Sequence, residues 1–166
     1  MKRIHIHIAV KQLAENIRFY SALFGVPPTV QREDYAKWKI DEPAVNFAIS
    51  NRGQSSGINH LGIQVDNDGE LQEIDQRLKA AQIAATKQDN AACCYAQSNK
   101  YWALDPQGVA WESFHTLHEI PVFGGDIQVS ERKNQAACCI PLPGDKIQNP
   151  ESKCCGVNSE GASGCC

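Results

Sequence analysis

RIHIHIAV, residues 3–10, alternates strictly between two kinds of side chain, and this octapeptide decides the fold. Isoleucines and a valine occupy the even positions, whereas His5, His7 and Ala9 occupy the odd ones. Because successive side chains of a strand point to opposite faces, the pattern predicts a half-buried strand that carries two imidazoles on one face.

The elements expected after this strand occur in an order that later starts again. Apolar residues at helical spacing predict a helix over 13–24, which Gly25 and two prolines end. NHLGIQV, residues 59–65, alternates like the first strand with His60 on its polar face, and a helix is expected over 71–81. Short strands are expected at 35–40, 44–49, 92–97, 100–104 and 109–114. The order predicts an α+β fold of two βαβββ modules, residues 1–52 and 57–118.

Length and charge limit the function classes. The chain has 166 residues, enough for one domain over 1–118 and an appendage, and its net charge of −3 shows no basic stripe for nucleic acid or anionic membrane. No apolar run approaches the roughly 20 residues of a membrane span, and the N-terminus lacks the apolar segment of a secretory signal. We therefore expect a cytoplasmic protein with neither kind of partner.

The cysteines occur only as adjacent pairs. The four pairs are Cys93 and Cys94, Cys138 and Cys139, Cys154 and Cys155, and Cys165 and Cys166. Neighbouring Cα atoms lie ~3.8 Å apart, less than the roughly 4.4–6.8 Å that disulfides prefer, so such a pair suits a large soft ion better than a staple. Crosslinks between pairs, or a small apolar role for the first pair, remain open. Residues 119–166 show no periodicity and are expected to be a flexible tail whose cysteines bind soft metal ions.

His5, His60 and Glu112 stand at matching places in the expected strands. Two imidazoles and one carboxylate form the facial triad of non-haem Fe(II) proteins, which leaves coordination positions open. The same donors suit Mn, Co, Ni or Zn. The alternatives are a structural or surface histidine and a plain edge-strand charge, and His7 is a rival ligand or a supporting residue behind the ligands.

Several strings resemble the vicinal-oxygen-chelate superfamily of glyoxalases, fosfomycin-resistance proteins and extradiol dioxygenases. They are HIHIAVKQLAENIRFYSALFG, NHLGIQV, AACCYAQ and DPQGVAWESF. The Cys-Cys-Tyr segment before DPQGVAWESF is similar to that of the iron-dependent carbon–arsenic lyases and the related cadmium-induced proteins. The resemblance covers residues 1–118 and implies a cup-shaped mixed sheet. It matches His5, five residues before Val10, to the first ligand, His60 and Glu112 to the others, and Cys93 and Cys94 to the thiol pair.

This resemblance implies an Fe(II)-dependent dioxygenase that detoxifies trivalent organoarsenicals such as methylarsenous acid or aromatic arsenicals. Cys93 and Cys94 would hold arsenic by two As–S bonds, while the metal site uses O2 to oxidise the attached carbon and arsenite is released. A glyoxalase-type fourth carboxylate is missing from residues 44–49, which leaves room for dioxygen. Tyr95 and Tyr101 would offer a phenol to the reaction or belong to the core.

Two other functions compete with the lyase. One is a non-enzymatic cadmium- or arsenite-binding resistance protein, and the other is a glyoxalase-like metalloenzyme. The preference between methyl and aromatic arsenicals stays open, as does a homodimer, with the metal site within one chain or shared between two.

Overall fold

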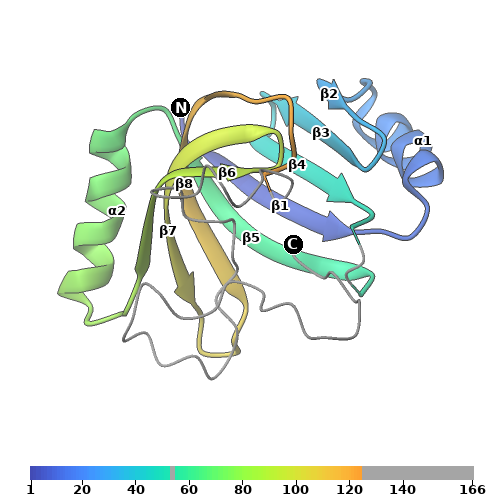
Figure 1. Ribbon diagram of the computed structural model, residues 1–166. Coiled ribbons are helices and arrows are strands. Elements are labelled where there is room, and N and C mark those ends of the chain that lie inside the picture. The colour runs from blue at the N-terminus through green and yellow to red at the C-terminus, as the bar shows by residue number, and fades with distance from the viewer. Residues whose placement is uncertain (53–54, 125–166) are drawn as a thin grey trace, which may run out of the picture.

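In a computed structural model, which describes residues 1–52 and 55–124, eight strands form one mixed sheet that curls around a concave face (Figure 1). The strands are β1 Arg3–Ala9, β2 Val30–Gln31, β3 Tyr35–Ile40, β4 Val45–Ser50, β5 Gly57–Val65, β6 Thr86–Cys93, β7 Ala96–Leu104 and β8 Ala110–Glu119. The helices are α1 Leu13–Phe24 and α2 Asp68–Ala80.

The strand order β2-β3-β4-β1-β5-β8-β7-β6 confirms the two-module α+β fold. The first strand of each module, β1 or β5, pairs in parallel with the last strand of the same module, β4 or β8. These two first strands pair with each other antiparallel at the centre of the sheet, with His7 opposite His60. The odd-numbered histidines of β1 therefore meet the polar face of β5.

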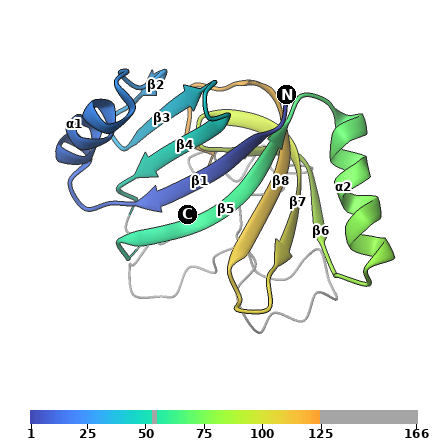
Figure 2. The same ribbon diagram turned by 180° about the vertical axis from the view of Figure 1, so that it is seen from behind.

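Each helix covers the convex side of its own module (Figures 1 and 2). Beneath α1, Leu13 packs with Trp38, Phe47 and Ile49, which are buried. Beneath α2, the buried residues are Val65, Leu71, Ile74 and Tyr101. Burying each such large side chain contributes about 1.5–3 kcal/mol, so these two clusters hold the sheet in its curled form. The concave side is left for polar residues.

The helix ends follow local chemistry. Gly25 ends α1 with a φ of 70°, in the left-handed region that glycine enters without steric cost. The side chain of Asn67 caps α2 by accepting a hydrogen bond from the backbone N–H of Glu70.

The strand predicted over 92–97 is wrong. β6 ends at Cys93 and β7 begins at Ala96, so Cys94 and Tyr95 form a two-residue hairpin turn. Their φ angles of 57° and 61° are those that a type I′ turn requires, and such turns usually carry Asn or Gly. Neither residue occurs here, so the sequence shows no turn signal. The short β2 and the first half of β6 were not predicted either.

The chain remains packed beyond residue 118, where the predicted boundary lies. The backbone N–H of Ile120 donates to the carbonyl of Tyr95, and the ring of Phe123 is buried beside Tyr35 and Ala48. The domain division stays a prediction. The six cysteines of the predicted tail, Cys138, Cys139, Cys154, Cys155, Cys165 and Cys166, lie outside the described residues. Over 1–52 and 55–124, neither helix is long and apolar enough to cross a membrane.

Candidate metal centre and thiol pair

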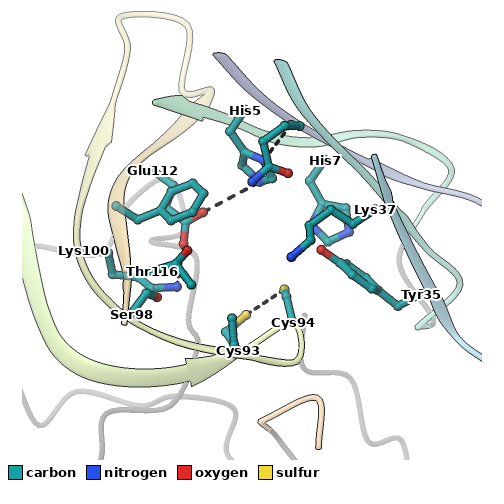
Figure 3. Close-up of a pocket in the computed structure, with 13 residues that line it drawn as sticks. His5, His7, Tyr35, Lys37, Cys93, Cys94, Ser98, Lys100, Glu112 and Thr116 are labelled. Carbon is teal, nitrogen blue, oxygen red and sulfur yellow. Dashed lines mark hydrogen bonds and ion pairs between the residues drawn. The ribbon is translucent and has the colours of Figure 1, made fainter. Parts of the chain in front are cut away.

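A small cavity of about 40 Å³ opens on the concave face of the sheet. Side chains from both modules line it, among them His5, His7, Cys93, Cys94, Lys100 and Glu112. Figure 3 shows the two sulfurs on one side of the cavity and His5 on the other, with Glu112 and Lys100 between them. The fold thus brings the predicted thiol pair and two of the three predicted ligands, His5 and Glu112, to one space, and the third ligand, His60, is in contact with His5.

Three potential metal donors converge at this place from three neighbouring strands. The Nε2 atoms of His5 and His60 lie 3.1 Å apart, and Oε2 of Glu112 lies 3.8 Å from the first and 3.5 Å from the second. Two donors about 2.1 Å from one ion and at right angles to each other are about 3 Å apart. The spacing therefore fits a divalent ion with small adjustments.

Hydrogen bonds fix the tautomer and the orientation of the His5 and His60 imidazoles. Nδ1 of His5 donates to the backbone carbonyl of Asn46 at 3.0 Å, and Nδ1 of His60 donates to Oδ1 of Asn59 at 2.7 Å. Each ring then carries its lone pair on Nε2, the atom that faces the other ring and Glu112. Three acceptors without a proton between them repel one another, so the arrangement favours a cation.

Neutral imidazoles also follow from burial. Burial, followed by the charge of His60, lowers the pKa of His5 to about 4 from its ordinary 6.5. His7 is affected in the same way, and its pKa falls well below the ordinary value. Since a metal binds the neutral ring, the site is ready for an ion at neutral pH.

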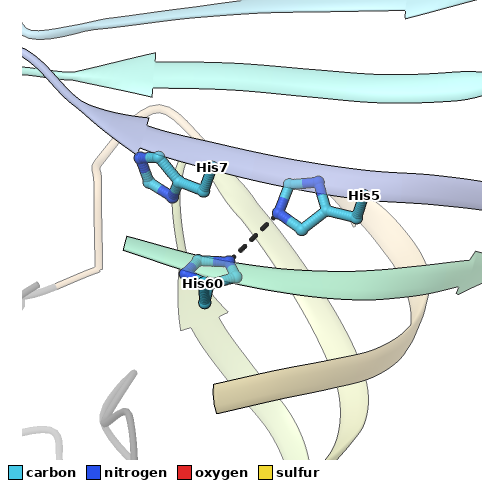
Figure 4. Close-up of side chains that lie close together, drawn as sticks. All are labelled: His5, His7 and His60. Atoms are coloured by element: carbon cyan, nitrogen blue, oxygen red, sulfur yellow. Dashed lines mark hydrogen bonds between the residues drawn. The ribbon is translucent and has the colours of Figure 1, made fainter. Parts of the chain in front are cut away.

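His7 keeps both of its predicted alternatives. The ligand atoms of His5, His7 and His60 all lie within 4.8 Å of one another (Figure 4). Nε2 of His7 bonds to Oγ of Ser50 at 2.9 Å, while its Nδ1 is buried without a hydrogen-bond partner among the described residues. Oδ1 of Asn46, on the same cavity, is in the same condition. Buried polar atoms left in this way are expected where an ion or water binds.

Lys100, on β7, is a member of the site that the sequence analysis missed. Its ammonium lies 2.6 Å from Oε1 of Glu112, and the two side chains are only 3% and 7% exposed. Burial alone would raise the pKa of Glu112, but Lys100 and the two imidazoles outweigh it and hold that pKa well below its usual range. The carboxylate is therefore charged at every physiological pH. The sequence signal that could have pointed to Lys100 is strand alternation, which puts Ser98, Lys100 and Trp102 on one face of the strand.

The cysteine pair stands at the end of a strand and the start of a turn, and Cys93 is disulfide-bonded in the structure. Cys93 is the last residue of β6 and is 4% exposed, whereas Cys94 is the first turn residue and is partly exposed. Their sulfurs lie 2.9 Å apart and both face the cavity (Figure 3). The left-handed backbone at Cys94 turns the chain there and is the kind of local strain found at functional sites.

The two tyrosines proposed for catalysis lie elsewhere. Tyr101 packs beneath α2 with Leu71 and Ile74, on the face of β7 opposite to Lys100, which favours the core alternative. The hydroxyl of Tyr95 donates to Asp34 at 2.5 Å, and its ring packs 5.7 Å from that of Tyr35. Neither tyrosine lines the cavity, but Tyr95 anchors the turn that carries Cys94.

Comparisons with known proteins agree with this fold. A sequence model of the Glyoxalase/Bleomycin resistance protein/Dioxygenase superfamily matches residues 2–113. The chain is 31% identical over 172 residues to a trivalent organoarsenical cleaving enzyme of Bacillus sp. strain MD1, covering 100% of this chain and 99% of that protein. It is 29% identical over 166 residues to cadmium-induced protein CadI of Mycobacterium bovis, covering 99% of this chain and all of the relative.

Among solved structures, homoprotocatechuate 2,3-dioxygenase from Brevibacterium fuscum superposes with a TM-score of 0.54 at 14% identity. The match covers 74% of this chain and 39% of the dioxygenase. At this identity the likeness concerns the fold alone.

Proposed function

The chain belongs to the glyoxalase/bleomycin resistance protein/dioxygenase superfamily, and we propose that within it the protein cleaves the carbon–arsenic bond of trivalent organoarsenicals to give arsenite. The observation that carries this proposal is one cavity lined by an adjacent cysteine pair and by His5 and Glu112, whose donor atoms lie close to Nε2 of His60. The name of the Bacillus relative supports the same reaction. Methylarsenous acid and aromatic arsenicals are the proposed substrates.

His5, His60 and Glu112 are the proposed ligands of a divalent metal, with Fe(II) as the working ion and Ni, Co, Mn or Zn able to use the same donors. When bound, Fe(II) supplies the redox chemistry by which O2 oxidises the carbon attached to arsenic. Lys100 keeps Glu112 ionised and holds its Oε1, so that Oε2 is the oxygen presented to the imidazoles. His7 supports this group or joins it.

In the reduced state, Cys93 and Cys94 would bind arsenic through both sulfurs and leave the organic group to extend toward His5 and Glu112. Soft arsenic prefers sulfur, while the imidazole and carboxylate donors prefer a harder ion, so the two ends of the cavity do not compete. A reducing compartment such as the cytoplasm would keep the pair available. The tail cysteines are proposed to collect soft ions for the same chemistry.

The test is an assay of reduced, full-length protein loaded with Fe(II) and given methylarsenous acid, with and without oxygen. We expect arsenite only in the aerobic sample. Glu112→Gln and Cys94→Ser should each abolish release, whereas His115→Gln should not, because His115 on β8 pairs with Asp68 away from the cavity. Arsenite formed without oxygen or metal would refute the proposal.

Two alternatives have their own outcomes in this assay. A binding protein, which the CadI relative would suit, would take up cadmium or arsenite without releasing product and would do so after Glu112→Gln. A glyoxalase-like enzyme would convert a hemithioacetal with Ni or Zn in the absence of oxygen.

A further inference from the structure

Lys37, on β3, extends its ammonium into the cavity from the side opposite to Lys100 (Figure 3). The residue is half-buried, and burial lowers the pKa of its ammonium. Lys100 is already paired with Glu112. Within the described part of the chain, the Lys37 ammonium forms neither an ion pair nor a hydrogen bond, so it is a cation held at the cavity with its charge available.

The neighbours of Lys37 are also the neighbours of Cys94. Tyr35 shares a face of β3 with Lys37, and Ala48 is the residue of β4 directly opposite Lys37. Cys94 packs against the cluster formed by Tyr35, Ala48 and Phe123. The hairpin turn therefore places the Cys94 sulfur on the strand pair that carries Lys37.

We propose that Lys37 activates Cys94 for the capture of arsenic, by stabilising its thiolate and by protonating the hydroxide that leaves arsenic. This inference rests on the proposed function, because it concerns the substrate-binding step of the same cavity. It assigns the two lysines different tasks: Lys100 serves the carboxylate, and Lys37 serves the thiol.

The capture step is a substitution at arsenic that involves no change of oxidation state. The Cys94 thiol gives its proton to solvent, and the thiolate attacks the arsenic of an As(III)–OH group. An As–S bond forms, the As–O bond breaks, and the departing hydroxide takes a proton from the Lys37 ammonium and leaves as water. Solvent returns a proton to Lys37, so that one thiol and one As–OH give one As–S bond and one water.

Other titratable groups lie around Lys37 and Cys94 and influence their charges. Glu119, Lys39 and Arg32 influence Lys37 from the strand ends, and Tyr35, His7, Lys100 and Glu112 share the cavity. Glu112 and Lys100 neutralise each other, and His7 is neutral by burial. Because burial also raises the pKa of Tyr35, its phenol stays neutral, which leaves Lys37 as the cation that acts on the thiol.

The test compares alkylation of Cys94 by iodoacetamide across a range of pH in the reduced, full-length protein, with the label located by tandem mass spectrometry. Neutral replacements Lys37→Gln and Lys37→Met should move the pH midpoint upward and slow alkylation at neutral pH by about tenfold, since an opposite charge nearby shifts a titration by about one unit or more. Lys37→Arg should retain most of the rate. Lys39→Gln is the matched control, an exposed lysine of the same strand outside the cavity lining.

A second arm measures how fast methylarsenous acid protects Cys94 from the label. We expect both neutral variants to be slower by a similar factor. Wild-type midpoints and protection rates in both neutral variants would overturn the inference, even if the protein releases arsenite. Conversely, an alkylation shift in the neutral variants, together with no arsenite release by the wild type, would refute the proposed function and still support the activation of Cys94 by Lys37.

Discussion

The ammonium of Lys100 lies 2.6 Å from Oε1 of Glu112, while Oε2 of the same carboxylate faces the Nε2 atoms of His5 and His60. One carboxylate thus joins the ammonium carried by β7 to the imidazoles of β1 and β5. Four residues that are distant in the sequence form a single charged cluster, and the stability of that cluster can be measured without any substrate.

Replacing Lys100 by methionine should destabilise the protein by about 3–5 kcal/mol, because it leaves a buried carboxylate without its main partner. Urea unfolding of metal-free protein measures this loss. The double variant Lys100→Met/Glu112→Gln should recover most of it, since a neutral amide replaces the stranded charge. Equal stability of Lys100→Met and the wild type would contradict a buried ion pair.

The metal-free protein should lose stability as the pH falls from 6.5 toward 4, the window set by the lowered pKa of His5. In this window the imidazole of His5 is protonated in the unfolded chain but not in the folded protein. The stability that depends on the neutral imidazole is therefore complete above the unfolded pKa and is lost on acidification. For His5 the loss is on the order of 3 kcal/mol, because each pKa unit corresponds to about 1.4 kcal/mol. Urea midpoints in the presence of EDTA measure it.

His5→Gln should remove part of this pH slope and leave the part that His7 contributes, because burial lowers the pKa of His7 as well. Glu112 acts only at lower pH: its depressed pKa gives stability that is present above the ordinary carboxyl range and is lost below it. A stability that rises on acidification between neutral pH and 4 would contradict neutral, buried imidazoles.

Gly62→Ala should destabilise the protein by about 1–3 kcal/mol and weaken metal binding. A Cβ at this position would lie 2.2 Å from the backbone oxygen of Glu112, and β5 and β8 must then move apart. Urea unfolding measures the first effect and calorimetric titration with a divalent ion the second. Unchanged values for both would show that the two strands separate without cost.

Tyr95→Phe should cost about 1.5–3 kcal/mol, since a hydrogen bond to the Asp34 carboxylate is lost, and should slow arsenite release because the Cys94 turn is less firmly held. Tyr101→Phe is the comparison: its ring packs beneath α2, so release should stay near the wild-type rate. Arsenite assays on both variants decide between a positioning and a catalytic phenol. A large loss in Tyr101→Phe alone would contradict this placement.

Alternation within strands and helical spacing were sufficient for the order of elements, both helices and most strands. The exception is the hairpin turn at Cys94 and Tyr95. Cys94 and Tyr95 adopt left-handed backbone angles without the Gly or Asn that usually marks them, so the hairpin was predicted as one strand. Lys37 and Lys100 were overlooked because a lysine in a strand normally faces solvent, and only the curled sheet turns these two toward a cavity.

The sequence by itself determined which residues share a face, because the side-chain period of a strand is a local property of the backbone. It therefore placed His5 with His7 on one side of β1 and His60 on the polar side of β5. Only the tertiary structure decided that Lys100 meets Glu112, that Asn46 and Asn59 orient the imidazoles, and that Cys94 and Lys37 line one cavity. These contacts join strands far apart in the chain, and their geometry depends on register and sheet curvature, which no local pattern specifies.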